Sequence, residues 1–217
     1  MPLYPSIRPM GDAALLVELG DEIDPMINAR VHALAASLSR VPGVTACVPA
    51  YASLLVEFDP GVSGESEVRE RVDRALASAE AVSPLEPRVV EIPTRYGGEF
   101  GPDLDFVAQR SGLSPREVIR LHSAEPFRVF MLGFAPGFPY AGPLPAAIAA
   151  PRLDTPRSRV PAGSVAIAGR QTGIYPLESP GGWRLIGRTD LVLFDPARDP
   201  PALLRPGDYV RFVLADP

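Results

Sequence analysis

The residues best suited to chemistry gather in one segment, 157–175 of this 217-residue chain. Arg157, Arg159 and Arg170 surround a Pro-Ala-Gly-Ser turn, and three polar side chains follow: Gln171, Thr172 and Tyr175. A guanidinium can bind a carboxylate or phosphate through two parallel hydrogen bonds, and neighbouring polar groups can orient the ligand. The segment predicts a site for a small anionic substrate, with Arg157 as the clamp. Surface arginines on a loop are the alternative.

The chain offers only two histidines for acid–base work, His32 and His122. His122 follows an expected helix, precedes a strand and has Glu125 nearby in sequence. A helix C-terminus stabilises positive charge, so this position favours a protonated imidazole, for structural or catalytic use. We take His122 as the candidate for proton transfer and give His32, which lies among alanines on a helix, a structural or solvent-facing role.

Glycine and proline repeatedly interrupt short apolar segments between 130 and 189. Proline fixes φ and glycine permits positive φ, so the alternation specifies loop shapes, and the aromatic content argues against disorder. An apolar loop such as 132–140 predicts contact with a ligand or partner, whereas Trp183 either covers a ligand or plugs a barrel end. The expected substrate-contacting residues of these loops are Gly133, Phe134, Pro136, Gly137, Phe138, Pro161, Gly163, Ser164, Gly182 and Trp183.

Composition excludes several classes of function. The net charge is −5 and no long basic run occurs, so nucleic acid is not an expected partner. No apolar run approaches the roughly 18 residues of a membrane span and no signal-peptide pattern is present, which predicts a cytoplasmic protein without membrane contact. The single cysteine, Cys47, excludes a cysteine metal cluster, and we predict no metal site.

All 21 basic residues are arginine, because the chain contains no lysine. Schiff-base chemistry and the phosphate-binding loop G-x-x-x-x-G-K-[ST] both require lysine, so this chain supplies neither. The catalytic patterns Gly-x-Ser-x-Gly, His-Glu-x-x-His and Cys-x-x-Cys are also absent. A nucleotide bound here would need backbone amides and arginine, or a partner protein.

The first 90 residues have the pattern of a ferredoxin-like domain. Strand-like segments at 13–19, 44–48, 54–58 and 88–92 alternate with two helical patterns, 24–41 and 66–80. Asp24 with Pro25 marks the start of the first helix. The order β, α, β, β, α, β predicts a split βαβ domain over 1–90.

From residue 91 the pattern changes to two short helices followed by many short strands. A Gly-rich loop leads into a helix with Asp103 in its first turn, and Ser114, Pro115 and Glu117 cap the next helix. Strands are expected at 127–132, 164–168, 183–186, 190–194 and 209–214, separated by Gly- and Pro-rich turns. The sequence therefore predicts an α+β protein whose second domain, 91–217, is an antiparallel β-barrel.

Five long segments resemble the KipI family, also called allophanate hydrolase subunit 1 or the 5-oxoprolinase B subunit. They read YGGEFGPDL (96–104), HSAEPF (122–127), LGFAPGFPY (132–140), TPRSRVPAGSVAIAGRQTGIYPLESPGGWRLIGRT (155–189) and LLRPGDYVRF (203–212). The resemblance covers most of the chain and is weakest before residue 90. It implies a ferredoxin-like domain followed by a cyclophilin-like barrel, without proline isomerase activity, because a fold does not fix a function.

The resemblance also implies an activity with partners. It suggests a component, inactive alone, of a bacterial ATP-dependent 5-oxoprolinase that converts 5-oxo-L-proline, a small anionic amide, to L-glutamate. The implied partners are a C subunit of the KipA or allophanate hydrolase subunit 2 type and an A subunit of the lactam-utilization type, and ATP would be shared with or supplied through them. The alternatives are an inhibitor of a sensor histidine kinase, or a component of an amide- or urea-type carboxyltransferase or allophanate hydrolase.

Overall fold

A computed structural model describes residues 4–78 and 87–215, which belong to two compact units. Unit 1 is Met1–Glu86 and unit 2 is Pro87–Pro217. Each unit mixes helices and strands, so the predicted α+β class is confirmed. Among the described residues, no helix combines the length and the apolar character that crossing a membrane would require.

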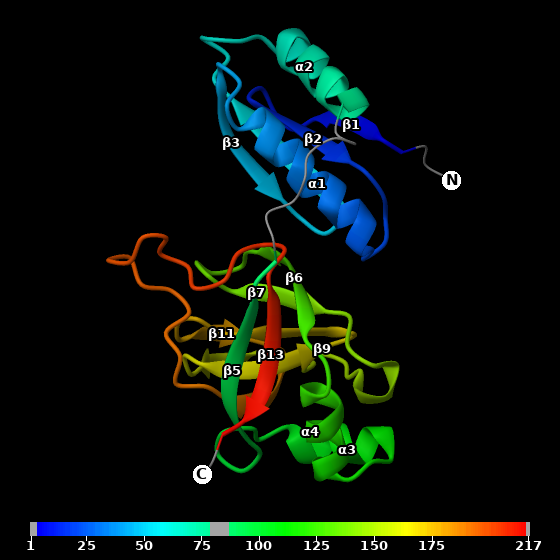
Figure 1. Ribbon diagram of the computed structural model, residues 1–217, viewed down its shortest axis with the longest axis vertical. Helices are drawn as coiled ribbons and strands as arrows, with labels where there is room; N and C mark the ends of the chain where they lie inside the picture. Colours follow the sequence, from blue (N-terminus) through cyan, green and yellow to red (C-terminus); the bar gives the residue numbers. More distant parts are fainter. Residues whose placement is uncertain (1–3, 79–86, 216–217) are drawn as a thin grey trace. The chain divides into compact units, whose positions relative to one another are not determined.

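Unit 1 is a four-stranded antiparallel sheet with two helices (Figure 1). Its elements are β1 (Ser6–Pro9), β2 (Ala14–Glu18), α1 (Pro25–Leu38), β3 (Val44–Pro49), β4 (Ser53–Phe58) and α2 (Glu65–Ser78), with strand order β1-β2-β4-β3. The Asp24 side chain caps α1 by accepting hydrogen bonds from the amides of Met26 and Ile27, at 2.7 and 2.9 Å. One apolar cluster joins both helices to alternate residues of β2 and β4.

The structure corrects the expected strand set of unit 1. The segment 88–92, expected as the last strand of this sheet, is part of β5 (Val89–Tyr96), and β5 lies in unit 2. The position beside β2 is filled instead by β1, whose Ile7 pairs with Val17. A domain boundary at 90 would therefore cut through β5, whereas the division of the chain into two units falls between positions 86 and 87.

Unit 2 is a closed barrel with two helices and a small added sheet. After β5 come α3 (Leu104–Ser111), α4 (Pro115–Ser123), β6 (Phe127–Leu132), β7 (Pro139–Gly142), η2 (Ala146–Ile148), β8 (Arg157–Val160), β9 (Ser164–Ala168), β10 (Gln171–Ile174), β11 (Ser179–Gly181), β12 (Arg184–Arg188) and β13 (Tyr209–Leu214). The barrel order is β10-β7-β6-β13-β5-β12-β9, and β8 pairs with β11 outside it.

The barrel fits the cyclophilin-like expectation with two corrections. Neighbouring strands of the barrel are antiparallel, with the exception of β5 and β13. These two strands are parallel, with Val89 opposite Tyr209 (Figure 1). The segment 190–194, expected as a strand, contributes only an isolated bridge from Phe194 to Ala202. The predicted capping box of α4 is present, with Ser114 and Glu117 satisfying each other's backbone amides.

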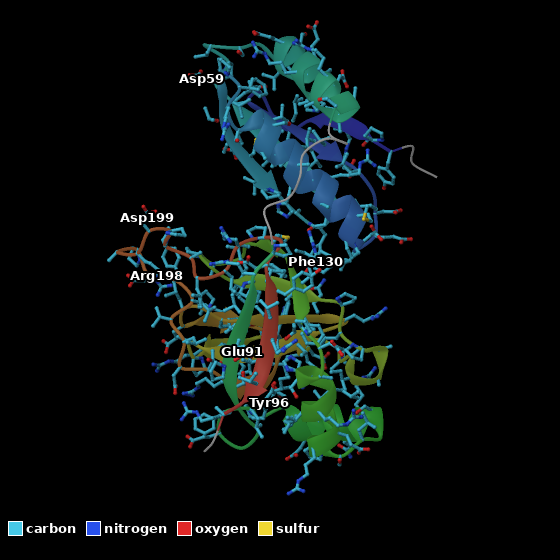
Figure 2. All side chains as sticks on the ribbon, in the orientation of Figure 1. Asp59, Glu91, Tyr96, Phe130, Arg198 and Asp199 are labelled. Atoms are coloured by element: carbon cyan, nitrogen blue, oxygen red, sulfur yellow. The ribbon has the colours of Figure 1, made fainter. Side chains whose placement is uncertain are left out.

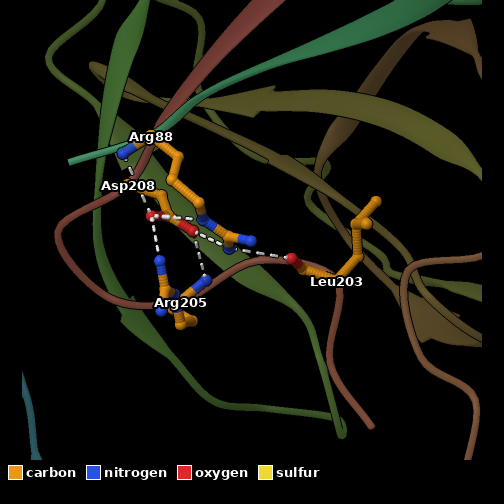
Figure 3. A network of polar contacts seen from close by, with 4 residues as sticks. All are labelled: Arg88, Leu203, Arg205 and Asp208. Atoms are coloured by element: carbon orange, nitrogen blue, oxygen red, sulfur yellow. Dashed lines mark hydrogen bonds and ion pairs between the residues drawn. The ribbon is translucent and has the colours of Figure 1, made fainter. Parts of the chain in front are cut away.

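A buried carboxylate fixes the parallel closure at the start of both strands (Figure 3). Asp208 accepts hydrogen bonds from the Arg88 guanidinium and from the Arg205 amide, and Arg88 also donates to the Leu203 carbonyl at 3.1 Å. Burial favours a raised pKa for Asp208, but these hydrogen bonds outweigh burial and lower its pKa. The charged pair therefore holds β5 against β13.

Candidate functional site

Strand β9 is buried on both faces, and this is what gives unit 2 a second apolar layer outside the barrel. Val165 and Ile167 point into the barrel core, whereas Ala166 and Ala168 belong to a separate cluster. Alternate residues of a strand point to opposite faces, so one strand serves both clusters. The small alanine side chains leave room for large rings above the outer face of the barrel.

Five aromatic residues fill this space, and we call them the aromatic layer: Phe134, Phe138, Tyr140, Tyr175 and Trp183. They come from the loop after β6, from β7, from the end of β10 and from the start of β12. The Phe138 ring packs edge-on against Tyr175 and Trp183, with centroids 5.2 and 5.5 Å apart. Such pairs contribute about 0.5–1.5 kcal/mol each beyond burial, so the layer holds three loops together.

Gly181 permits this packing at one decisive point. A Cβ on Gly181 would lie 2.3 Å from the Tyr175 hydroxyl oxygen, so any other residue would displace the ring. The predicted loop glycines did not include Gly181, although it lies in the SPGGW motif that indicated a shaped loop.

Phe134 is the exposed member of the aromatic layer. Its side chain is 62% exposed, and it is the single non-glycine residue with positive φ, 66°, in the described ranges. The loop is held by hydrogen bonds from the Phe138 amide to the Ala135 carbonyl and from the Gly133 amide to the Phe138 carbonyl. A strained backbone that displays an aromatic ring to solvent is typical of a functional loop.

Arg157, the expected clamp, is paired with a carboxylate of the same unit. Its Nη2 donates to Asp103 Oδ1 at 2.9 Å, and Asp103 Oδ2 accepts from the Leu185 amide at 2.7 Å. Asp103 precedes α3 but makes no capping hydrogen bond with its side chain. Arg157 Nη1 is buried and has no hydrogen-bond partner in the described part of the chain.

The other two arginines of the predicted cluster point elsewhere. Arg159 forms an exposed ion pair with Glu178 at 2.6 Å, and Arg170 donates to the Leu144 carbonyl at 3.1 Å. A basic side chain that sequence reasoning missed, Arg152, lies over the Trp183 ring with 5.8 Å between its guanidinium carbon and the centroid. In the sequence, the neighbouring prolines Pro151 and Pro156 were the feature that could have indicated a shaped loop at Arg152.

The predicted group Gln171, Thr172 and Tyr175 is split between two faces. Thr172 is fully buried, and its hydroxyl meets His122 inside the barrel. Tyr175 belongs to the aromatic layer outside, and Gln171 lies opposite Ala168, a residue of the outer cluster. The alternation of β10 explains the split, so Thr172 cannot share a surface ligand with Tyr175.

His122 is a core residue, which corrects its expected protonation. Tyr96, labelled in Figure 2 at the end of β5, lies 2.8 Å from Nδ1, and Thr172 Oγ1 lies 2.9 Å from Nε2. Thr172 in turn donates to the Ala166 carbonyl, so the network assigns the ring proton to Nε2 and makes Tyr96 the donor to Nδ1. Burial lowers the pKa of His122 to about 3, so the imidazole is neutral.

The buried imidazole predicts a loss of stability in mild acid. Below pH 6.5 the unfolded chain binds a proton at this histidine and the folded chain does not, so stability falls as pH decreases. The expected loss is about 2 kcal/mol between pH 6.5 and 5, at roughly 1.4 kcal/mol per unit. Urea unfolding at each pH measures it. His122→Gln should flatten this dependence and His32→Gln should keep it; an equal slope in all three proteins would contradict the assignment.

The remaining predicted residues build turns around the aromatic layer. The Gly163 amide donates to the Tyr175 carbonyl at 2.7 Å, and the Tyr175 amide donates to the carbonyl of buried Ser164 at 2.9 Å. The Gly182 carbonyl accepts from the Leu153 amide at 2.7 Å. Pro161 is half-buried and Pro136 is exposed, whereas Gly137 is buried with a φ of 79°. The structure thus brings together the loop residues and leaves His122 and Thr172 inside.

No group of three or more potential metal ligands occurs within residues 4–78 and 87–215. The surface at the aromatic layer presents the exposed ring of Phe134, the half-buried ring of Tyr140 and the exposed side chain of Arg152. Such a surface suits a small ligand that has an anionic group and an apolar body.

Comparisons with known proteins match this chain over nearly its whole length. The model of the carboxyltransferase domain, subdomain C and D, matches residues 5–204. The chain is 48% identical over 219 residues to the B subunit of 5-oxoprolinase from Bacillus subtilis (strain 168), covering 95% of this chain and 91% of that protein.

Two solved structures share the fold. The crystal structure of TTHA0988 has a TM-score of 0.82 and 44% identity, covering 94% of this chain and 40% of that one. The Kluyveromyces lactis urea carboxylase has a TM-score of 0.79 and 25% identity, covering 97% of this chain and 22% of that one. The chain therefore spans less than half the length of each of these two proteins.

Proposed function

Because the chain belongs to the carboxyltransferase-domain family, subdomains C and D, which its match over residues 5–204 establishes, we propose that it is the B subunit of a 5-oxoprolinase. This enzyme uses ATP to open the lactam of 5-oxo-L-proline to L-glutamate. The observation that carries the proposal is the 48% identity to a protein of that name over 95% of this chain and 91% of that protein.

The surface of unit 2 supports a role in holding a small carboxylate between the proteins of a complex. Phe134 displays an aromatic ring on a strained loop, which suits contact with a partner protein. Arg152 is exposed and lies over Trp183, which suits contact with an anionic group. We propose that the partners are a KipA-type protein with a homologous barrel and a protein of the lactam-utilization type.

The residues of this surface do not fit the triphosphate of ATP. Arg157 is neutralised by Asp103, Arg159 by Glu178, and Arg170 is bonded to a backbone carbonyl. A triphosphate needs several free cationic groups or a loop of backbone amides, and the chain has no lysine. We propose that ATP is bound chiefly by the two partner proteins, and that this chain contributes to holding the lactam.

Reconstitution tests the proposal directly. Mixing this protein with its KipA-type and lactam-utilization-type partners should give glutamate from 5-oxoproline with matching ATP hydrolysis, and omitting any one protein should abolish turnover. Glutamate measured by a coupled dehydrogenase assay is the readout, with phosphate release in parallel. A complex of all three proteins that forms no glutamate would overturn the assignment.

The urea carboxylase likeness supports a second candidate, a protein that acts on a urea-type amide. The same mixture supplied with urea and bicarbonate instead of 5-oxoproline separates the two. Turnover of urea alone would favour this candidate. The regulatory alternative requires binding to a sensor histidine kinase. The relatives from Bacillus subtilis and Kluyveromyces lactis are named for enzymes, so the enzymatic function is preferred.

A further inference from the structure

We propose that Arg95 and Arg188 form a binding site for a phosphoryl group on the outer wall of the barrel, beside the ring of Phe100. None of these residues belongs to the aromatic layer, and the site does not rest on the proposed function. Its ligand is a tetrahedral oxyanion, either free phosphate or a phosphoryl group of a nucleotide.

Strand register brings the two arginines together. Arg188 of β12 is the direct partner of Arg95 of β5 in an antiparallel pair. Residues in such positions share one face, with Cβ atoms about 4.5–5.5 Å apart, and two like charges there are unfavourable. Thr94 is buried and Tyr96 reaches His122 in the core, so the residue between them, Arg95, points outward. The barrel therefore holds two guanidinium groups close together on its outer surface, against their mutual repulsion.

One aromatic ring supports both guanidinium groups. The guanidinium carbons of Arg95 and Arg188 lie 4.3 and 5.5 Å from the centroid of Phe100. Such contacts contribute about 0.5–1 kcal/mol at exposed sites. The backbone of Phe100 is anchored, because its amide donates to the Gly97 carbonyl at 3.0 Å and the Gly97 amide donates to the Ile186 carbonyl at 3.1 Å. The ring is therefore a fixed support for the two positive charges.

The charge of this pair is not balanced within the described ranges. Arg188 forms no ion pair or hydrogen bond with any residue there. Arg95 forms an ion pair at 2.5 Å with Asp190, whose side chain is 81% exposed. Exposed ion pairs contribute about 0–1 kcal/mol, so Asp190 can release Arg95 at little cost. An incoming oxyanion would meet two guanidinium groups and one weakly held carboxylate.

The nitrogen atoms of Arg188 show where a ligand can reach this side chain. Nε is buried and has no hydrogen-bond acceptor in the described part of the chain. The two Nη atoms also have no acceptor there, but they are not buried, so their donors face solvent. A hydrogen bond to a charged group contributes about 1.5–3 kcal/mol. An oxyanion at the Nη atoms would therefore stabilise a guanidinium that is partly removed from water and has no counterion.

Geometry and charge select the class of anion. A carboxylate presents its oxygens in one plane, which matches the fork of a single guanidinium. A phosphoryl group has three strong acceptor oxygens in different directions and about two negative charges at neutral pH. It can therefore accept hydrogen bonds from Arg95 and Arg188 together. We expect phosphate to bind more tightly than acetate.

Isothermal titration calorimetry of the full-length protein with inorganic phosphate, at constant ionic strength, tests the site. We expect saturable binding, and Arg188→Gln should raise the Kd by about tenfold, the effect of losing one charge-assisted contact. Arg159→Gln is the matched control, because Arg159 is an exposed arginine paired with Glu178, and it should leave the Kd unchanged. Urea unfolding establishes that both variants are folded. No saturable heat, or the same Kd in Arg188→Gln, would overturn the site.

A second pair of variants tests the competing carboxylate. Asp190→Asn frees Arg95 and should lower the Kd for phosphate by about threefold. Glu178→Gln removes an exposed carboxylate from Arg159 and should leave the Kd unchanged. Equal effects of the two substitutions would show that phosphate responds only to net charge, which would overturn the site. Acetate that binds as tightly as phosphate would overturn the phosphoryl assignment.

ATP identifies the source of the phosphoryl group. If ATP displaces phosphate and binds more weakly to Arg188→Gln, the site holds a phosphoryl group of a nucleotide. If phosphate still binds in the presence of excess ATP, the site takes free phosphate. Either result supports the site, and neither depends on turnover of 5-oxoproline by the three-protein mixture.

Discussion

Replacing Gly101 by alanine is expected to lower the free energy of unfolding of unit 2 by about 3 kcal/mol. A Cβ at this position would lie 2.0 Å from the Ile186 carbonyl oxygen, 2.2 Å from its carbon and 2.7 Å from the Gly97 nitrogen. These are backbone atoms, so no side chain can rotate away. The surrounding loop is bonded to β12 through the Gly97 and Asp103 amides, which restricts any shift of the loop itself.

Gly98→Ala is the matched control in the same loop. No atom outside its immediate neighbours lies within 4 Å of a Cβ there, but its φ is 53°. The expected cost is therefore about 1 kcal/mol, from positive φ alone. Urea unfolding followed by Trp183 fluorescence reports on unit 2, which contains this residue. Equal destabilisation by the two substitutions would show that close backbone contact is not the cause.

Asp103→Ala is expected to destabilise unit 2 by about 3–5 kcal/mol, the usual cost of removing one partner from a buried ion pair. The substitution leaves the half-buried Arg157 guanidinium without its carboxylate and the Leu185 amide without its acceptor. Asp103→Asn keeps an acceptor oxygen for Leu185 and should cost less. Chemical unfolding monitored at Trp183 gives the free energies.

Glu178→Gln provides the comparison for Asp103. It removes the partner of Arg159 in an exposed pair, and such pairs contribute about 0–1 kcal/mol. A loss as large as that of Asp103→Ala would mean that burial does not distinguish the two pairs.

Local patterns predicted several elements residue for residue. The strands Phe127–Leu132, Ser164–Ala168 and Tyr209–Leu214 were found because each is a short apolar run between clear turn signals. β1 was missed, since its four residues include Arg8 and Pro9 and show no apolar run. β5 was found as a strand, but periodicity does not reveal which sheet a strand joins, so it was given to the wrong one.

The site was predictable as a set of loops and not as a set of contacts. The aromatic and glycine content of 132–140 and 179–183 indicated shaped loops, and these meet in the aromatic layer. The partner of Arg157, however, lies 54 positions away, and no local pattern connects Asp103 to it. The helix-terminus argument for a charged His122 was wrong because burial dominates the local dipole.

The parallel closure of the barrel sets an order of events during protein synthesis. The first strand of unit 2, β5, cannot complete its pairing until the last strand, β13, has been synthesised. The reason is that β5 pairs with β13 and Arg88 binds Asp208, which lies 120 positions later in the chain. Unit 1, in contrast, has all four strands within its first 58 residues and can fold while translation continues. A ribosome that stops between β12 and Tyr209 therefore leaves a finished first unit and an open barrel with two unpaired strand edges, a form prone to aggregation and degradation.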